Sequence, residues 1–183
     1  MDRKTRVRIS KRMSLALRHD PSSLGLTLDT AGWATLSALV AGLRQRGETI
    51  DIDDVLEAVR TSDKQRFALS TNGERIRANH GHSVDVDLGL APTTPPSTLF
   101  HGTSESTLGA IESQGLLPMA RRHVHLSADR STARTVASRR RGAIVILRID
   151  AGAMHGDGIE FYRSDNGVWL TSTVPPKYLA REE

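Results

Sequence analysis

Residues 91–97 divide this 183-residue sequence into two halves of different texture. The segment reads APTTPPS, and its three prolines restrict the backbone and remove N–H groups that a helix or central strand would need. Such a composition favours an extended, semi-rigid connection. We therefore expect two lobes, residues 1–92 and residues 98–183, in an α+β protein.

Composition limits the classes of protein to which the chain can belong. Cysteine is absent, which excludes disulfides, iron–sulfur clusters and thiol nucleophiles. The longest apolar stretches fall far short of the roughly 20 residues that span a bilayer. The N-terminus, MDRKTRVRISKRM, lacks the apolar core of a signal peptide. We expect a cytoplasmic monomer with no membrane partner and, because aromatic residues are only 4% of the sequence, an aliphatic core.

Positive charge is concentrated in two segments. The formal net charge is +4, yet residues 1–20 carry +5 and residues 121–148 carry +7, so the remainder is acidic. Two basic segments on an acidic body favour a polyanionic ligand, such as nucleic acid or a nucleotide. A solvated helix face is the alternative explanation for either segment.

The N-terminal half has the pattern of three helices followed by a hairpin. Helical spacing predicts a first helix that ends before Asp20-Pro21, a second that Gly47 stops, and a third that Asp51 caps. Residues 24–28 suggest a short strand, and Asn72-Gly73 predicts a tight hairpin turn. This order of elements is that of a winged-helix module.

The C-terminal half is predicted to be rich in strands. Its expected elements are a strand from Leu99, a helix over residues 108–111, a strand over 124–127, a basic helix over 129–141, a buried strand over 143–149 and a hairpin around residues 164–167.

Two clusters in the N-terminal half suit phosphate binding. Arg18-His19 combines a fixed charge with a group that can transfer a proton, although cations followed by proline also simply end a helix. The second cluster is Asn79-His80-Gly81-His82-Ser83. Its two histidines lack an obvious third ligand, so we expect no metal.

Two further features complete the candidate chemistry. Arg66 opens the predicted hairpin strand within KQRF, where a lone arginine is most often a surface residue. The cluster His101-Gly102-Thr103-Ser104 follows a strand, and its glycine and hydroxyls suit close approach to a ligand. It matches neither a P-loop nor a dinucleotide GxGxxG fingerprint.

The motifs LRHDP, KQRF, N-x-GHS, HGTS, HVHLS, SRRRG and FYRSDNGVWLT follow one another along the chain. Together they resemble the RNA 2′-phosphotransferase family, the NAD-dependent tRNA 2′-phosphotransferases, over about residues 8–180. The resemblance implies a winged-helix-like lobe and an ADP-ribosyltransferase-like lobe, with NAD and RNA meeting in a cleft between them. It implies an RNA partner with an internal 2′-phosphate, with tRNA and tRNA splicing as the eukaryotic case.

The resemblance also implies a reaction in two steps. The RNA 2′-phosphate attacks C1″ of the nicotinamide ribose and expels nicotinamide, which gives an ADP-ribosylated 2′-phosphate. The ribose O2″ then attacks phosphorus and releases 2′-hydroxyl RNA and ADP-ribose 1″,2″-cyclic phosphate. NAD is thus a consumed co-substrate, and no metal is implied.

Site residues follow from the same resemblance. The catalytic group is Arg18, His19, Arg66 and one arginine of the run 139–141, for which we choose Arg140 in a register ambiguous by one residue. The role of His19 as acid, base or orienting group stays open. NAD-binding positions are His101, Gly102, Thr103, Ser104, His125 and Ser127. RNA-binding positions are Asn79, Gly81, His82 and Ser83, and His80 replaces the family's usual glutamine.

Two other functions stay open. One is an ADP-ribosyltransferase that acts on protein or on nucleic-acid terminal phosphates. Protein-modifying enzymes of that type usually carry a glutamate where this chain has Val168, whereas a phosphate nucleophile is already anionic and needs no general base. The other is a non-catalytic winged-helix nucleic-acid-binding protein, which the acidic residues of segment 52–60 disfavour.

Overall fold

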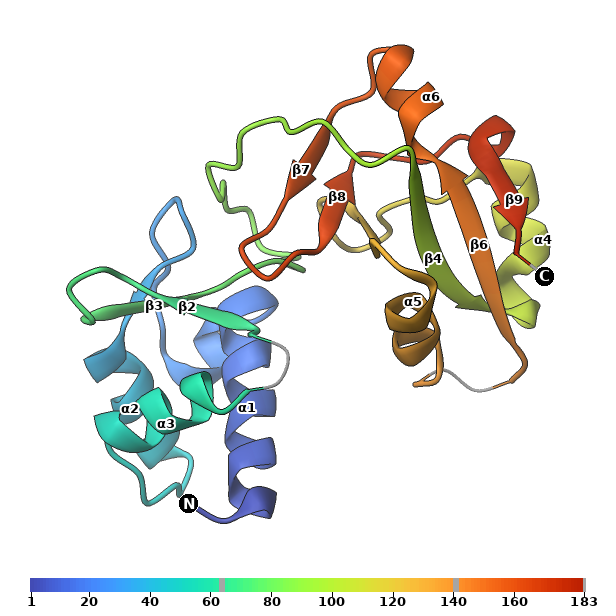
Figure 1. Cartoon of the computed structure of the whole chain (residues 1–183). Helices are drawn as coiled ribbons and strands as arrows, with labels where there is room; N and C mark the ends of the chain where they lie inside the picture. Colours follow the sequence, from blue (N-terminus) through green and yellow to red (C-terminus); the bar gives the residue numbers. More distant parts are fainter. Residues whose placement is uncertain (63–64, 140–141, 183) are drawn as a thin grey trace. The chain divides into compact units, whose positions relative to one another are not determined.

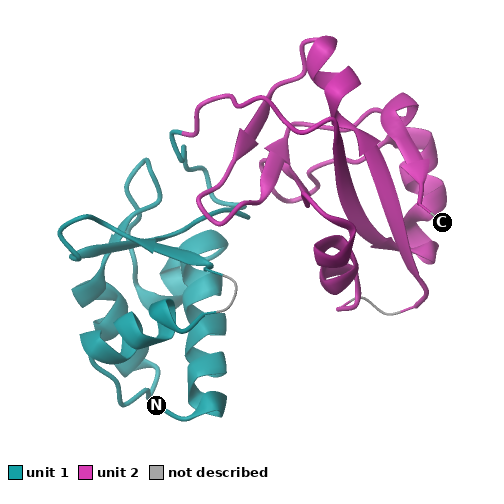
Figure 2. Cartoon of the chain, viewed as in Figure 1, with its two compact units in different colours: residues 1–89 teal, residues 90–183 magenta. Residues whose placement is uncertain are grey.

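The computed structural model describes residues 1–62, 65–139 and 142–182. The chain divides into two compact units, residues 1–89 and residues 90–183, drawn in teal and magenta in Figure 2. Each unit buries its own apolar cluster. Aliphatic side chains dominate both clusters, as the low aromatic content predicted, and Phe67 is the only aromatic residue in the first.

Unit 1 packs helices against a small antiparallel sheet (Figure 1). The sheet order is β1-β3-β2. The helices and the hairpin confirm the predicted order of elements, and the assignment to the winged-helix fold stays a prediction. In chain order the elements are α1 (Arg3–Arg18), the 3-10 helix η1 (Pro21–Leu24), β1 (Ala34–Thr35), α2 (Leu36–Gln45), α3 (Ile52–Arg60), β2 (Phe67–Leu69) and β3 (Arg75–Ala78).

Local side-chain hydrogen bonds explain where these elements begin. Asp51 caps α3 as predicted and forms a capping box with Asp54. The strand predicted over residues 24–28 is wrong, because Leu24 ends the η1 helix instead. Asp20 accepts a hydrogen bond from the Ser23 N–H, and Pro21 has the backbone angle that suits a helix start.

A buried acid ties α1 to the segment that follows α2. Glu48 is 5% exposed, and its two carboxylate oxygens accept hydrogen bonds from Arg8 Nε at 2.8 Å and Arg8 Nη2 at 2.7 Å. Arg12 Nη1 lies 3.0 Å from Glu48 Oε1. The hydrogen bonds from Arg8 hold the pKa of Glu48 below its ordinary value. Part of the positive charge at the N-terminus therefore stabilises the fold.

Unit 2 contains two three-stranded antiparallel sheets, with strand orders β4-β6-β9 and β5-β8-β7. Its elements in chain order are β4 (Thr98–Ser104), α4 (Glu105–Gln114), β5 (Val124–Leu126), α5 (Arg130–Ala137), β6 (Ile144–Asp150), α6 (Ala151–Gly156), β7 (Phe161–Arg163), β8 (Trp169–Thr171), the 3-10 helix η2 (Pro176–Tyr178) and β9 (Leu179–Arg181).

Most of the elements predicted for this half are confirmed. The strand from Leu99, the buried strand β6 and the β7–β8 hairpin lie where the sequence indicated. The basic helix is shorter than predicted, because α5 ends at Ala137 and Ser138 caps it. Strand β9 was not predicted, and it completes the sheet by pairing with β6.

Helix α5 packs so closely on β4 that only glycine fits at position 102. A Cβ atom on Gly102 would lie 2.1 Å from the Ala133 carbonyl oxygen and 2.8 Å from Ala137 Cβ. Backbone atoms cannot yield as a flexible side chain can, so a larger residue must displace the helix. The structure therefore gives Gly102 a packing role, besides the NAD-binding role that the sequence predicts.

The pH dependence of the free energy of unfolding should reveal the contribution of the Glu48–Arg8 ion pair when Glu48 is replaced. We expect Glu48→Gln to lower the free energy of unfolding by about 2 kcal/mol at pH 7. Because the folded-state pKa of Glu48 is lowered, its stabilisation is present above the unfolded-state pKa and is lost as pH falls through the folded-state value. The difference between the two proteins in urea unfolding should thus shrink towards pH 3.

Exposed Glu112 provides the control for that experiment. Glu112→Gln should unfold like the parent protein at both pH values. A Glu48→Gln deficit that stays constant from pH 7 to pH 3 would contradict the ion-pair explanation.

Gly102→Ala should destabilise unit 2 by about 1–3 kcal/mol, because the added methyl group overpacks the β4–α5 contact. Thermal unfolding followed by circular dichroism measures this change. The matched control is Gly109→Ala in α4, where a Cβ atom meets nothing within 4 Å and helix propensity improves. An unchanged unfolding transition in Gly102→Ala would disprove the packing role.

Candidate functional site

The end of α1 is joined to a segment far along the chain. The Arg18 carbonyl accepts hydrogen bonds from the Ser83 N–H at 2.8 Å and the Val84 N–H at 3.3 Å. The last carbonyls of a helix lack partners within the helix, so residues 83–84 supply them here. His19, the C-cap residue, then has its Nδ1 atom 3.0 Å from Ser83 Oγ. The structure thus brings together His19 and Ser83, two residues that the sequence placed in separate clusters.

Arg66 belongs to the same region. Arg18 Nη2 donates to the Arg66 carbonyl at 3.4 Å, and the Asn79 N–H donates to the same oxygen at 3.0 Å. The Asn79 amide group also donates to the Gln65 carbonyl at 2.6 Å. Gln65 has φ 39°, a left-handed conformation that few residues other than glycine adopt. Asn79 therefore holds the backbone that carries Arg66.

The other residues of this predicted cluster differ in exposure. His82 is buried at 4% exposure, whereas Gly81 and His80 are partly exposed. Gly81 has φ 86°, which lets the chain turn between Asn79 and Ser83. Unit 1 therefore collects Arg18, His19, Arg66, Asn79 and Ser83 by direct contacts, and the turn at Gly81 allows it.

Unit 2 brings the predicted NAD residues together through two strands. The Phe100 N–H donates to the Ser127 carbonyl at 2.9 Å, and the Ser127 N–H donates back at 2.8 Å. His101 Nδ1 lies 3.0 Å from the His125 carbonyl oxygen. These contacts join the start of β4 to the end of β5, so His101, His125 and Ser127 are neighbours.

Thr103 and Ser104 are placed differently. Both are buried, and the Thr103 hydroxyl lies 2.7 Å from the Thr107 hydroxyl. The Ser104 hydroxyl lies 3.1 Å from that of Ser106. Their side chains thus have partners at the start of α4, and their assignment to NAD stays a prediction.

Arg121 is a residue that the sequence reasoning missed. Its Nη1 atom lies 3.0 Å from His125 Nδ1. Arginine can only donate, so this His125 nitrogen accepts and carries no proton. Nearby His123 is half-buried, and its burial, followed by the positive charge of Arg122, lowers its pKa. The signal in the sequence was the basic pair Arg121-Arg122, which His123 separates from the strand predicted over residues 124–127.

The predicted catalytic arginine of the basic run lies outside the described residues. Arg140 and Arg141 are both outside them, and Arg139 is exposed after the end of α5. The choice among these three arginines therefore stays a prediction. Among residues 1–62, 65–139 and 142–182, no group of three or more histidine, aspartate or glutamate side chains is arranged to hold a metal ion.

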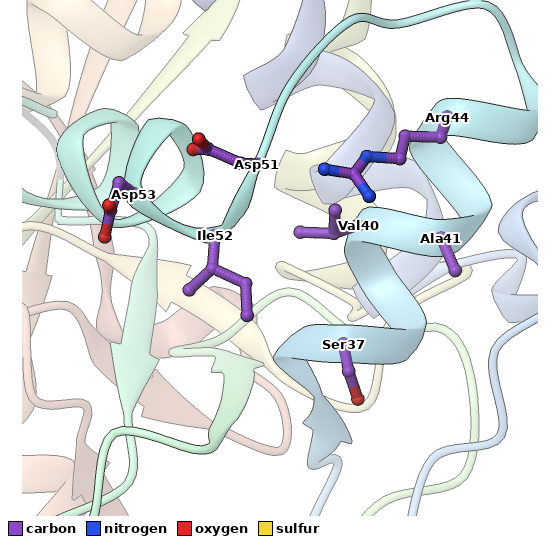
Figure 3. A pocket seen from close by; sticks show the side chains of 7 residues that line it. All are labelled: Ser37, Val40, Ala41, Arg44, Asp51, Ile52 and Asp53. Atoms are coloured by element: carbon purple, nitrogen blue, oxygen red, sulfur yellow. The ribbon is translucent and has the colours of Figure 1, made fainter.

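A pocket in unit 1 contains none of the predicted residues. It has a volume of about 370 Å³ and lies between α2 and α3. Figure 3 shows Arg44 from α2 on one side and Asp51 and Asp53 on the other. Arg44 Nε donates to the Ile50 carbonyl at 2.7 Å. Its acidic residues make the pocket unsuited to a polyanion.

In the described part of the chain, no helix has the length and apolar character needed to cross a membrane.

Comparisons with known proteins agree on one family. A family model described as RNA 2′-phosphotransferase, Tpt1 / KptA family, matches residues 4–173. A protein of Hahella chejuensis named "Probable RNA 2′-phosphotransferase" is 53% identical over 180 residues, which cover 98% of this chain and 96% of that protein. Proteins with the same name from Rhizobium rhizogenes and Pseudomonas aeruginosa are 52% and 48% identical.

These two alignments cover 94% and 98% of this chain, and 91% and 98% of the respective relatives. The match therefore includes both units, with the Arg18–His19–Arg66 region in one and the His101–His125 region in the other. Such identity over nearly the full length shows common descent of the whole chain. The chain belongs to the RNA 2′-phosphotransferase family, a family of transferases.

Proposed function

We propose that this protein removes an internal 2′-phosphate from RNA and consumes NAD in doing so. The observation that carries the proposal is the capping of α1 by residues 83–84, which gathers Arg18, His19 and Ser83 around one helix end. Arg66 is tied to the same place through its carbonyl. Family membership supports phosphate removal as the reaction for which this group is used.

Unit 1 has the chemistry needed to bind a phosphate dianion. Guanidinium groups such as those of Arg18 and Arg66 bind phosphate oxygens through two parallel hydrogen bonds. The contact with Ser83 fixes the orientation of the His19 ring. His19 thus lies next to Arg18 in the chain with one ring nitrogen oriented by a hydroxyl, as a proton-transferring group requires.

The residues of unit 2 fit NAD by the chemistry of their donors. Arg121 offers guanidinium N–H groups suited to a pyrophosphate, and His101, His125 and Ser127 offer ring nitrogens and a hydroxyl suited to ribose oxygens. His101 lies on β4 and His125 on β5, and the bridge between Phe100 and Ser127 joins these two strands. We therefore add Arg121 to the predicted NAD-binding residues.

The proposed reaction balances without a metal or an external base. A 2′-phosphate oxygen bonds to C1″ as the C1″–nitrogen bond breaks, and nicotinamide leaves with the electron pair as a neutral molecule. The ribose O2″ then loses its proton and bonds to phosphorus while the bond from phosphorus to the RNA 2′ oxygen breaks. That RNA oxygen gains a proton, and His19 is the side chain that can exchange it.

Arginines serve mainly the second step. Nicotinamide leaves C1″ readily, because its ring nitrogen is already cationic and becomes neutral on departure. The first step therefore mainly needs the phosphate to be placed beside C1″. Negative charge develops on phosphorus oxygens in the second step, and one preorganised donor there contributes about 10²–10³ in rate. A tRNA is one candidate substrate, and a nucleic-acid terminal phosphate is an alternative acceptor because it has the same nucleophile.

Incubation with NAD and a short RNA that bears an internal 2′-phosphate tests this function. We expect 2′-hydroxyl RNA and ADP-ribose 1″,2″-cyclic phosphate in equal amounts, with activity unchanged by EDTA. The same RNA without NAD is the control. Phosphate release that does not need NAD would disprove the proposal, and loss of turnover on chelation that one metal restores would disprove the arginine-only account.

Single-turnover kinetics test the division between the two steps. Alanine at Arg18, His19, Arg66 or Arg140 should leave some intermediate formation but slow its conversion at least tenfold. Arg121→Ala should instead slow the first step, because Arg121 belongs to the NAD residues. Labelled 2′-phosphorylated RNA reports substrate, intermediate and product together.

Arg139→Ala is the matched control for Arg140, because it removes the same charge one residue away. A defect in Arg139→Ala with normal Arg140→Ala would shift the register by one residue. If His19→Ala and Arg66→Ala slowed both steps equally and no intermediate accumulated, the step-specific roles would be wrong.

A further inference from the structure

Trp33 is an aromatic residue that the core of unit 1 does not use. Unit 1 contains only two residues of the Phe, Trp and Tyr types, Trp33 and Phe67. Phe67 is 5% exposed and belongs to the buried apolar cluster, whereas Trp33 is partly exposed and lies outside it. A large aromatic side chain left at the surface of such an aliphatic unit requires an explanation other than core packing.

Two arginines of β3 accompany the Trp33 ring. The guanidinium carbon of Arg77 lies 4.7 Å from the ring centroid, and that of Arg75 lies 5.5 Å from it. Alternate residues of a strand face the same side, so Arg75 and Arg77 share the face opposite to buried Ile76 and Ala78. The outer face of the sheet therefore presents an indole ring with two planar guanidinium groups over it.

This arrangement is held in place by other contacts. The Asp29 Oδ1 atom accepts hydrogen bonds from the backbone N–H of Trp33 at 2.9 Å and from the backbone N–H of Ala31 at 3.0 Å. Its Oδ2 atom lies 3.3 Å from Arg75 Nη1. Arg77 Nη1 donates to the Leu88 carbonyl at 3.4 Å. The backbone that carries the ring and the two guanidinium groups are thus held in place, which reduces the entropy that a ligand would have to offset.

The Trp33 face is close to the phosphate-binding group of unit 1. Arg77 pairs with Ala68 across the sheet, and the Asn79 N–H bonds to the Arg66 carbonyl two residues further along. Arg66 and Arg77 are therefore diagonal neighbours, typically about 7–8 Å apart. On the other side, a Cβ atom on Gly32 would lie 3.6 Å from His82 Nε2, next to Ser83.

We propose that Trp33, with Arg77 and Arg75, is a stacking platform for an unpaired RNA base that neighbours the 2′-phosphorylated nucleotide. Unstacked bases are recognised by stacking on aromatic rings and on arginine planes. The two cations also suit the adjacent phosphodiester. This inference rests on the proposed function only in that RNA is the substrate; it adds where the flanking nucleotide binds.

The experiment uses the full chain and three synthetic RNAs, without NAD. Each is a trinucleotide with a 2′-phosphate on its central nucleotide, and two of them lack the base on the 5′ or the 3′ side. Binding is measured by anisotropy of labelled RNA and by quenching of tryptophan fluorescence. The chain has two tryptophans, and Trp169 is buried in unit 2, so Trp33→Phe leaves only that one.

We expect Trp33→Ala to bind the complete trinucleotide about tenfold more weakly, and Trp33→Phe to stay within about threefold of the parent protein. Quenching should occur in the parent protein and vanish in Trp33→Phe. One of the two abasic RNAs should bind equally to the parent protein and to Trp33→Ala. Arg77→Ala should weaken binding of the complete RNA more than Arg3→Ala, which removes an exposed cation from the first turn of α1.

Two results would overturn the platform. One is unchanged affinity of Trp33→Ala for the complete RNA. The other is an equal loss for all three RNAs, which would show that Trp33 only supports the fold around His82 and Ser83. If the parent protein binds RNA through Trp33 but never removes its 2′-phosphate with NAD, the proposed function fails and the platform stands.

Discussion

The candidate site of unit 1 depends on the hydrogen bonds that the Arg18 carbonyl accepts at the end of α1. This carbonyl receives the N–H groups of Ser83 and Val84, and this closes a loop of more than sixty residues onto the end of α1. Without that closure His19 would have no Ser83 hydroxyl to orient it. Helix capping, usually a matter of stability, here assembles residues that the chain keeps far apart.

A comparable constraint operates in unit 2, where close backbone approach replaces capping. Strand β4 carries four of the predicted NAD residues, and α5 packs on it at Gly102 with no room for a Cβ atom. The bridge between Phe100 and Ser127 then joins β4 to β5 and makes His101 and His125 neighbours. Loss of activity in a Gly102 variant would therefore report on packing as well as on any NAD contact.

Periodicity and turn chemistry predicted most helices and strands correctly, because these signals are local. The prediction of a strand over residues 24–28 was wrong because Asp20-Pro21 starts a 3-10 helix there, a local signal that the sequence also contains. The buried pair of Glu48 with Arg8 could not be read, because nothing in a linear pattern says that a glutamate after α2 will meet α1. Arg121 was missed although its partner His125 is only four residues away, because their contact depends on the irregular conformation of the loop before β5.

The sequence by itself determined most of the order of elements, the aliphatic character of both cores and the motifs that identify the family, because each depends on residue type and near spacing. Tertiary structure alone decided which polar groups meet: Arg18 with Arg66, His19 with Ser83, and His101 with His125. It also decided that both arginines of β3 lie against Trp33. The physical reason is that hydrogen bonds and ring contacts between distant residues require the backbone to be closed first, and that closure depends on packing across the whole unit.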